Sequence, residues 1–364
     1  MALINEPKLL IADEPTTALD VTIQAQILAL LAELRKKRGI GVLLVSHDLA
    51  VVADIADRIV VMQEGRVVEA GDRDAIFRRA RHPYTQKLLQ AIPRGGKAEP
   101  LPASEPLVTV RNLSTWFAQG KSTVKAVDDV SFDVRRGEVL GVVGESGSGK
   151  STVGRSLLRL VPVTAGQVYF DGVEVTALRP RELTALRRRM QFIFQDPFAS
   201  LNPRMTVYDT LAEPMLLHGV ASRSNVAGHV LKLMDDVGLA RAFVRKYPHE
   251  FSGGQRQRIA IARALATRPE FVVADEPVSA LDVTIQAQIL ALMRTLAREY
   301  GLTMLFISHD LAVVRQLADR ILVLHRGKVV EQADTEELFA RGRHAYTRQL
   351  LDSIPGKSLL ETRI

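Results

Sequence analysis

The chain has 364 residues, 47% of them hydrophobic and 24% charged, which is enough for one large domain or for two smaller ones with real cores. It contains no cysteine, which excludes disulfides, thiolate zinc sites and cysteine-ligated iron–sulfur clusters and fits a reducing cytoplasm. The formal charge of +7 comes with short basic runs, such as 35–38 and 187–189, that carry no interleaved aromatic residues, so no nucleic-acid binding is expected. The sequence contains no apolar run of about 18 residues, so no membrane-spanning helix is predicted, and no signal-peptide pattern is evident.

The first 93 residues resemble a later part of the same chain. ADEPTTALDVTIQAQILAL at 12–30 recurs as ADEPVSALDVTIQAQILAL at 274–292, an offset of 262 residues (274 − 12). The offset holds without a gap from Pro7/Pro269 to Pro93/Pro355, and 48 of these 87 pairs are identical. A repeat this long indicates two copies of one folding unit.

The two copies differ in what precedes them. Over 160 residues (107–268) stand before Pro269, but only residues 1–6 stand before Pro7. We therefore expect residues 1–93 to be the C-terminal part of a truncated first domain, from a shortened gene, a fragmentary reading frame or a mis-called start. Such a piece would leave an unpaired strand edge and exposed apolar faces. Residues 94–106, rich in Pro, Gly and small residues, are predicted to be a linker, 107–355 a complete domain and 356–364 a C-terminal tail.

Apolar runs in the complete copy alternate with segments of helical period, which predicts an α/β fold with a mostly parallel sheet covered by helices. The runs at 139–143, 271–274, 303–308 and 321–325 are the expected buried strands. Apolar side chains at helical spacing follow Asp282, at positions 285, 289, 292, 293 and 296.

A phosphate-binding loop is predicted directly after the strand at 139–143. Its glycines let backbone N–H groups wrap phosphates, and the helix that it opens adds positive potential. Lys150 is expected to reach the β- and γ-phosphates, and the Ser151 hydroxyl to bind Mg²⁺. The loop consists of Gly144, Glu145, Ser146, Gly147, Ser148, Gly149, Lys150 and Ser151.

Two carboxylates end the apolar strand at 271–274. The strand delivers Asp275 and Glu276 to the carboxyl edge of the sheet, where parallel sheets bind their ligands. Beside a phosphate loop, Asp275 is expected to hold Mg²⁺ and Glu276 to activate the attacking water. Alone, such a pair is more typical of a surface turn.

A second glycine pair precedes the helical run IAIARALA. Ser252, Gly253, Gly254 and Gln255 stand at a helix N-terminus, where backbone amides form an anion site. The alternative is a simple helix start with Ser252 as N-cap, and the two interpretations are compatible.

Together these segments resemble the ATP-binding cassette (ABC) ATPases. ESGSGKS, FQDP, FSGGQ, VVADEP, SALD and ISHD stand in that family's order over 107–355. The resemblance implies a P-loop NTPase fold, RecA-like, with helices on both faces of the sheet and an α-helical subdomain at about 196–262, preceded by a partial copy of the same fold. It also implies that two domains dimerise head to tail, each ATP lying between one phosphate loop and the other domain's SGGQ.

The resemblance assigns roles to further residues. Gln195 is expected to sense the γ-phosphate, to contact Mg²⁺ and to face the membrane partner, and His309 is expected to hold the γ-phosphate near Glu276. Asp282 would contact the opposite domain, and Thr152 would join the phosphate site. Phe117 matches the aromatic residue that stacks on adenine, with core packing as its alternative.

Finer matches indicate a subfamily. The segments at 192–207, 280–290 and 343–351, the last with a twin at 81–89, are similar to ATPases of oligopeptide, dipeptide, nickel and glutathione importers. That similarity implies permease subunits in the membrane, a second ATPase domain and, indirectly, a solute-binding protein as partners, at the cytoplasmic face of the inner membrane. Two alternatives stay open: a soluble tandem cassette ATPase acting on ribosomes or DNA, and an inactive remnant that binds nucleotide at most.

Overall fold

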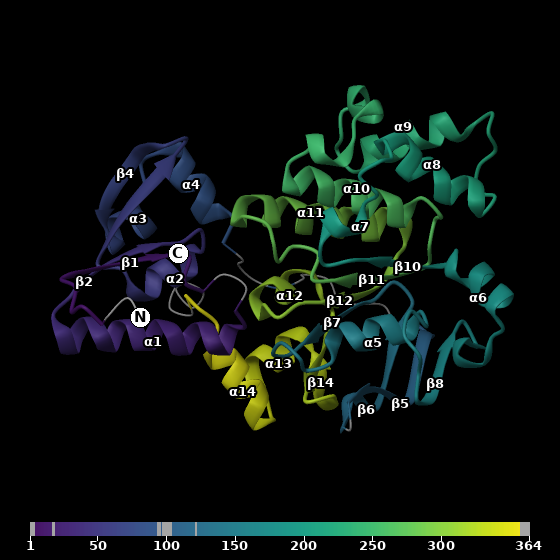
Figure 1. The fold of residues 1–364 in the computed structure, drawn as a ribbon, viewed down its shortest axis with the longest axis horizontal. Helices are drawn as coiled ribbons and strands as arrows, with labels where there is room; N and C mark the ends of the chain where they lie inside the picture. The colour runs from purple at the N-terminus through teal and green to yellow at the C-terminus, as the bar shows by residue number, and fades with distance from the viewer. Residues whose placement is uncertain (1–3, 17–18, 93–95, 97–103, 121, 357–364) are drawn as a thin grey trace.

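A computed structural model describes residues 4–16, 19–92, 96, 104–120 and 122–356. Most of the predicted linker and all but the first residue of the predicted C-terminal tail lie outside these ranges. Figure 1 shows two regions side by side, an N-terminal region (residues 4–92, purple to blue) and a larger second region (104–356). Within the described part of the chain, no helix is both long and apolar enough to cross a bilayer.

The N-terminal region contains two small sheets flanked by helices. Strands β1 and β2 pair in parallel, and β3 and β4 pair antiparallel as a separate sheet. A compact apolar cluster, which includes Ile76 and Phe77, lies beneath the second sheet. The elements are β1 (Leu9–Asp13), α1 (Val21–Arg38), β2 (Gly41–Val45), α2 (Leu49–Ile55), β3 (Arg58–Gln63), β4 (Arg66–Asp72), α3 (Arg73–Arg79) and α4 (Pro83–Gln90).

The last eight helices and strands of the second region have the same bounds as the eight of the N-terminal region, shifted by 262 residues. Both long helices end at a left-handed glycine, Gly39 in α1 and Gly301 in α11, which is the usual way to close a helix C-terminus. The elements are β11 (Phe271–Asp275), α11 (Val283–Tyr300), β12 (Thr303–Ile307), α12 (Leu311–Leu317), β13 (Arg320–His325), β14 (Lys328–Asp334), α13 (Thr335–Arg341) and α14 (Ala345–Asp352).

A six-stranded sheet forms the centre of the second region. Its order is β10-β11-β12-β7-β13-β14, parallel except for β14 at one edge, where β10 is Met190–Ile193 and β7 is Val139–Val143. Every residue of β7, β11 and β12 is buried, as expected of strands covered on both faces. The four predicted strands are thus confirmed to within one residue at each end.

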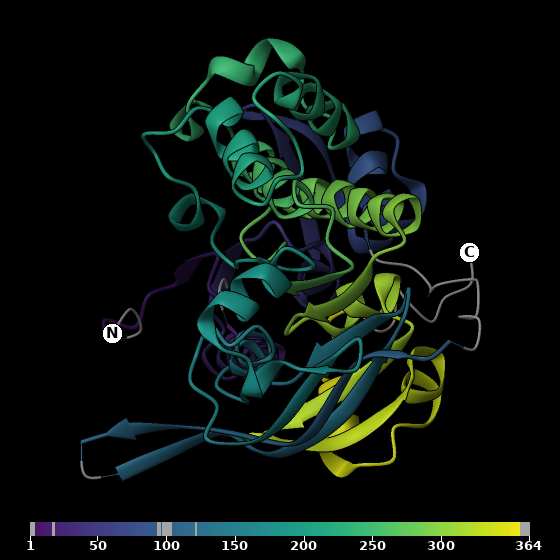
Figure 2. The ribbon, with the colours of Figure 1, turned by 90° about the vertical axis from the view of Figure 1, so that its right-hand side faces the viewer.

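A four-stranded antiparallel sheet, which the sequence did not predict, covers part of one face. Its order is β6-β5-β8-β9, with β5 (Pro106–Gln119), β6 (Ser122–Arg135), β8 (Ala165–Phe170) and β9 (Val173–Glu174). Figure 2 shows the β5–β6 hairpin reaching away from the domain. One apolar cluster joins this sheet to β7, β11, β12 and helix α5 (Lys150–Leu157).

A second and larger apolar cluster joins the other face of the central sheet to a group of helices. Among these helices are α8 (Val207–Leu217), α9 (Val226–Asp236) and α10 (Gly253–Leu265), toward the top of Figure 1. Together with the short helix α7 (Pro197–Ser200), which contacts α10, they match the predicted helical subdomain. Helix α6 (Pro180–Arg187) packs instead with the first cluster.

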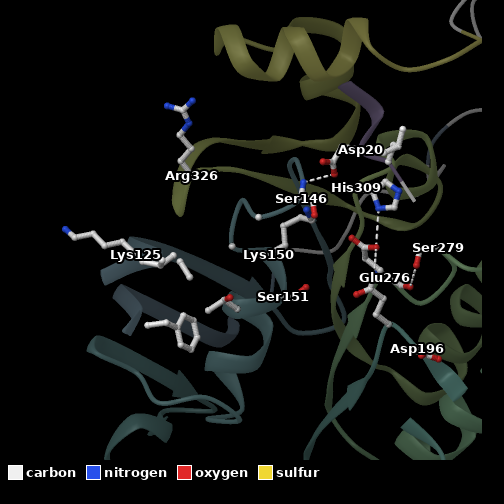
Figure 3. Close-up of a pocket in the computed structure, with 18 of the residues that line it drawn as sticks. Asp20, Lys125, Ser146, Lys150, Ser151, Asp196, Glu276, Ser279, His309 and Arg326 are labelled. Carbon is white, nitrogen blue, oxygen red and sulfur yellow. Dashed lines mark hydrogen bonds and ion pairs between the residues drawn. The ribbon is translucent and has the colours of Figure 1, made fainter. Parts of the chain in front are cut away.

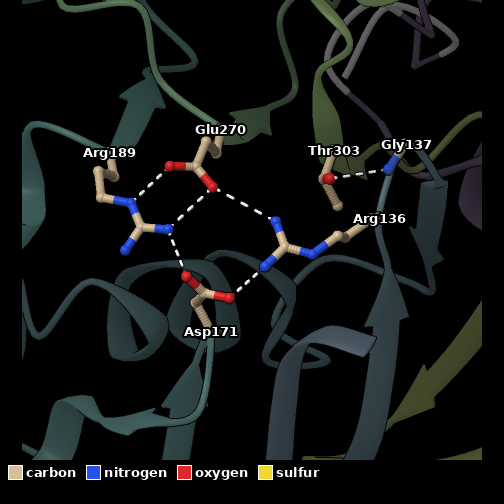
Figure 4. A network of polar contacts seen from close by, with 6 residues as sticks. All are labelled: Arg136, Gly137, Asp171, Arg189, Glu270 and Thr303. Carbon is tan, nitrogen blue, oxygen red and sulfur yellow. Dashed lines mark hydrogen bonds and ion pairs between the residues drawn. The ribbon is translucent and has the colours of Figure 1, made fainter. Parts of the chain in front are cut away.

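Four charged side chains tie the antiparallel sheet to the start of the central sheet (Figure 4). Arg189, just before β10, donates to Glu270, just before β11, at 2.5 and 2.9 Å and to Asp171 of the β8–β9 turn at 2.6 Å. Arg136, before β7, pairs with the same two carboxylates. The network lies at the amino ends of the strands, whereas the phosphate loop follows the carboxyl end of β7. The network therefore stabilises the fold and is not part of the site.

The two regions touch through corresponding elements. Helix α1 packs against α14, and its counterpart α11 packs against α4, the counterpart of α14. A polar contact adds to this, because the Gly356 N–H donates to the Asp54 carboxylate at 2.8 Å. The arrangement is the reciprocal one expected when two similar units pair about a twofold axis.

Candidate functional site

A pocket of about 930 Å³ opens at the carboxyl ends of β7, β11 and β12. Its wall combines the phosphate loop, the ends of β11 and β12, the β5–β6 hairpin and a short piece of the N-terminal region (Figure 3). Ligands of parallel α/β sheets bind at this edge. The pocket lies where the sequence predicted a nucleotide site.

The phosphate loop connects β7 to α5 in the predicted strand–loop–helix order. Gly149 has φ of +105°, and a Cβ added there would lie 2.2 Å from the Ala126 carbonyl oxygen, so a side chain is excluded. Helix α5 begins at Lys150 with its N-terminus at the pocket. Backbone N–H groups and the helix dipole therefore favour an anion here.

Lys150 is buried, and its ammonium is held by the loop itself. The Nζ donates to the carbonyl oxygens of Gly144 at 2.7 Å and Glu145 at 2.9 Å. Burial lowers the pKa of Lys150, while the carboxylates of Glu276, Asp20 and Asp275 act in the opposite direction. An incoming phosphate would supply a negative partner for this cation.

Ser151 and Asp275 lie together at the base of the pocket. The Ser151 hydroxyl donates to Asp275 Oδ1 at 2.7 Å. Asp275 is fully buried, and among the residues that the structure describes its Oδ2 has no hydrogen-bond partner, the nearest cationic group being the Arg155 guanidinium at 3.8 Å. Burial raises the pKa of Asp275. A buried carboxylate with an unsatisfied oxygen beside a hydroxyl fits a hard divalent cation such as Mg²⁺.

Glu276 is in contact with both predicted partners. His309 Nδ1 lies 3.2 Å from Glu276 Oε2, and Gln195 Nε2 donates to the same oxygen at 3.0 Å. Glu276 has a left-handed backbone with φ of 45°, a strained conformation for a non-glycine residue. The structure thus brings together the three residues predicted to be catalytic.

The titration of the Glu276–His309 pair is shifted in opposite directions. Burial raises the pKa of Glu276, but the hydrogen bond and charge of His309, together with Lys150, outweigh it and leave the pKa below its ordinary value. The hydrogen bond to Glu276 raises the pKa of His309 against the effect of burial. Glu276 is therefore favoured in its ionised form, as a proton acceptor must be.

Phe117 and Thr152 also line the pocket. Phe117 lies on β5 and is 38% exposed, so it is not a core residue. Val124 and Lys125 of the facing strand β6 lie on the same wall. Of the two interpretations of Phe117, the structure agrees with an aromatic wall for a ligand and not with core packing.

Two predicted groups are not part of the pocket wall. Ser252 caps helix α10 in a capping box with Gln255, and a Cβ on Gly254 would lie 2.4 Å from Ile285 Cγ2. Asp282 caps α11 by accepting the Ile285 N–H at 3.0 Å. The helix-start interpretation of Ser252 is confirmed.

The N-terminal region contributes to the pocket wall, which the sequence did not predict. Leu19 and Asp20 line the pocket, and the Ser146 N–H donates to Asp20 Oδ1 at 2.6 Å. Asp20 is the counterpart of Asp282, to which a role across domains was assigned. The same alignment therefore contained the signal for Asp20. Arg326, in the turn after β13, is another lining residue that the sequence did not predict.

The fold and the site define a P-loop nucleotide-binding protein. A glycine-rich loop opens a helix beside a Ser–Asp pair, whose aspartate is buried, and a Glu–His pair, all at the carboxyl edge of one parallel sheet. This combination is the one that cradles and hydrolyses nucleoside triphosphates.

Comparisons with known proteins narrow the class. Residues 127–279 match the family model described as "ABC transporter", and residues 68–114 and 330–358 match "Oligopeptide/dipeptide transporter, C-terminal region". A solved dimer of the ATP-binding cassette MJ0796 with ADP and Pi is similar in fold, with a TM-score of 0.58 and 32% identity over 63% of this chain and 98% of that one. The chain belongs to the ABC transporter family of ATPases, in the branch with the oligopeptide/dipeptide C-terminal region.

Curated relatives include the glutathione import ATP-binding proteins GsiA of Escherichia coli (strain K12) and Shigella boydii serotype 4, each 47% identical over 98% of this chain. The chain spans 62% of the length of these relatives. CbiO1 of Clostridium perfringens, from a cbiONQ transporter complex, is 24% identical with a TM-score of 0.58, and shares the fold.

Proposed function

We propose that this chain binds and hydrolyses Mg-ATP and thereby powers an importer of peptides or related small solutes, of the dipeptide, oligopeptide, nickel or glutathione type. The observation that carries the proposal is the Glu276–His309 pair beside the Lys150 loop, which joins a proton acceptor to a phosphate cradle. The match of both C-terminal segments to the oligopeptide/dipeptide transporter region, together with the name of the glutathione import relatives, supports the choice of solute class.

The proposed chemistry is attack of water on the γ-phosphorus. Glu276 takes a proton from the water while the bond between the γ-phosphorus and the bridging oxygen breaks, and ADP and phosphate leave. The loop amides of 144–152 and Lys150 compensate the phosphate charge, and His309 and Gln195 orient Glu276 and the γ-phosphate. Phe117 stacks on the adenine.

Ser151, Asp275 and Gln195 would hold Mg²⁺. When bound there, it would supply positive charge that offsets the negative charge of the phosphates. The unsatisfied oxygen of Asp275 and the hydroxyl of Ser151 support this assignment, because both are hard oxygen ligands within one small space.

We further propose that residues 1–93 correspond to the C-terminal part of a first ABC ATPase domain, that 94–106 link it to the complete domain at 107–355, and that 356–364 form a tail. The catalytic partner would then be a second ATPase domain that contributes an SGGQ segment, either Ser252–Gln255 of a second copy in a homodimer or the equivalent segment of another ATPase in a heterodimer. Membrane permease subunits would bind this assembly at the cytoplasmic face of the inner membrane, with a solute-binding protein as an indirect partner.

The proposed function is tested by nucleotide titration of the full chain and its Lys150→Ala variant, with a fluorescent ATP analogue and Mg²⁺. Lys150 is the cation assigned to the β- and γ-phosphates, so its loss should remove most of the binding. Lys87→Ala, on the N-terminal α4, is the control and should bind as the unmodified chain does. Equal affinity of Lys150→Ala and the unmodified chain would contradict the assignment.

The dependence on a second domain is tested by dilution. The N-terminal region has no SGGQ segment. If the SGGQ segment that contacts the ATP comes from another molecule, ATP turnover per molecule should rise with protein concentration over a hundredfold range, because the active species is a dimer. Turnover that stays constant across the range would show that one chain suffices.

A further inference from the structure

A side chain of the C-terminal helix reaches the phosphate loop. Tyr346, the second residue of α14, is buried, and its hydroxyl accepts the Glu145 N–H at 2.9 Å. The same peptide unit has its carbonyl, that of Gly144, bonded to Lys150 Nζ at 2.7 Å. One peptide plane of the loop is therefore held by Tyr346 on one side and by Lys150 on the other.

The ring of Tyr346 makes a second link to the loop. It stacks on His325, the last residue of β13, with centroids 4.0 Å apart and planes 19° apart. In the turn that follows, the Gly327 N–H donates to the Ser148 carbonyl at 2.9 Å. The loop is thus contacted at Glu145 by Tyr346 itself and at Ser148 by the turn that follows His325, on which the Tyr346 ring stacks.

The position of α14 is itself fixed by polar contacts. Glu331 on β14 accepts the N–H groups of Arg343 at 2.8 Å and of His344 at 3.0 Å. His344 Nδ1 then accepts the Tyr346 N–H at 3.2 Å and caps the helix. These contacts anchor the first turn of α14, from which Tyr346 extends to the loop.

The N-terminal region has the same local structure at the start of α4, but its sequence contains no phosphate loop. Glu69 accepts the N–H groups of Arg81 at 2.8 Å and His82 at 3.1 Å, and His82 Nδ1 accepts the Tyr84 N–H at 3.2 Å. No glycine-rich phosphate loop occurs in the sequence of residues 1–93. Tyr84 therefore has the helix-start geometry of Tyr346 but no phosphate loop to contact, which makes it a matched control.

We propose that Tyr346 is a positioning residue for the phosphate loop, through which helix α14 sets the affinity of the site for Mg-ATP. The inference rests on the proposed function. Burial raises the pKa of Tyr346 to about 12, so the hydroxyl stays neutral and keeps its role as acceptor throughout the physiological range. Its contact uses an amide on the strand side of the loop and leaves Lys150 and the helix N-terminus to the phosphates.

The test compares Tyr346→Phe with Tyr84→Phe in the full chain. Phenylalanine keeps the ring and its stacking and removes only the hydroxyl. We expect Tyr346→Phe to weaken binding of methylanthraniloyl-ATP with Mg²⁺ and to raise the KM for ATP by about two- to tenfold, the range that one neutral hydrogen bond supports. The kcat at saturating ATP should stay within about twofold, because Glu276 and His309 are not displaced.

Thermal denaturation separates positioning from a merely structural role. A structural loss would lower the melting temperature of Tyr346→Phe and leave the KM of the folded protein unchanged, which would overturn the inference. An unchanged affinity in Tyr346→Phe, or an equal loss in Tyr84→Phe, would overturn it too. If the unmodified chain itself fails to bind the analogue, the proposed function fails, and this outcome is distinct from the other three.

Discussion

Strands β2 and β12 occupy equivalent positions in the two regions, but their side chains meet different surroundings. Leu305 of β12 is completely buried, while its counterpart Leu43 of β2 is 53% exposed. The same holds for Val273 and Ile11, which is 63% exposed. In the second region β7, α5 and the antiparallel sheet cover these positions. Burial of a strand is thus decided by the elements that cover it and not by its own sequence.

The two Glu–His pairs extend the comparison to chemistry. His47 Nδ1 lies 2.9 Å from Glu14 Oε1, close to the 3.2 Å of the His309–Glu276 pair, and Glu14 has the same left-handed backbone with φ of 43°. Only the second pair lies in a pocket with a phosphate loop. The repeated segment therefore gives both Glu–His pairs a similar geometry. The difference between them is the phosphate loop, which lies beside the Glu276–His309 pair and would bind the substrate.

The largest expected difference between the regions is in turnover. Glu276→Gln keeps the shape of the side chain but cannot take a proton from water, so hydrolysis should fall by about 10²- to 10⁴-fold while ATP binding persists and an ATP-trapped dimer is favoured. Glu14→Gln, its matched control, should stay within about twofold of the unmodified chain. Phosphate release at saturating ATP measures both. Residual activity of Glu276→Gln within about threefold would assign the base elsewhere, with His309 the first candidate.

The next difference is in stability. Leu305→Ala opens a cavity between β12, β7 and the covering sheet and should lower the free energy of unfolding of the second region by about 2–5 kcal/mol. Leu43→Ala, the same substitution at the equivalent exposed position, should change it by less than about 0.5 kcal/mol. Urea denaturation followed by circular dichroism measures both. Similar losses in the two variants would mean that the face of β2 is covered in solution.

Much of this comparison follows from the sequence, but some of it does not. Apolar runs locate β7, β11, β12 and β13, and motif order brings together Lys150, Asp275 and Glu276, because strand ends of one parallel sheet share an edge. The antiparallel sheet was missed because β5 and β6 are interrupted by register shifts that disturb their alternation. The contact of Asp20 is signalled by its alignment with Asp282, whereas that of Tyr346 depends on how α14 packs against the phosphate loop, which no local pattern encodes.

A third prediction concerns the pH dependence of turnover. Glu276 must be ionised to act as a base, and His309 holds its pKa below the ordinary value against the effect of burial. In His309→Ala burial remains without that partner, so the pKa of Glu276 rises and the acid limb of the kcat profile should move to higher pH. His47→Ala lacks this link to the pocket and should leave the limb in place. A limb at the same pH in both variants would separate His309 from the titration of Glu276.

The smallest expected effects are those of replacing Asp20 and Asp282, the equivalent aspartates at the starts of α1 and α11. Asp282 caps its helix, whereas Asp20 makes no such cap and instead accepts the Ser146 N–H at the pocket. Asp282→Ala should therefore cost about 1 kcal/mol of stability. Asp20→Ala should leave the melting temperature nearly unchanged, but it removes a negative charge beside the phosphate loop.

ATP carries several negative charges, so the removal of the Asp20 carboxylate should strengthen its binding by a few-fold. The gain should shrink as salt is raised, because partly exposed charges are screened. Titration of both variants with a fluorescent ATP analogue at low and high salt, with a melting curve for each, measures the two effects separately. Stability lost in Asp20→Ala with unchanged affinity would mean that this aspartate acts as a helix cap, as its twin does. The two regions would then differ in their coverage and in their loop, but not in the role of this residue.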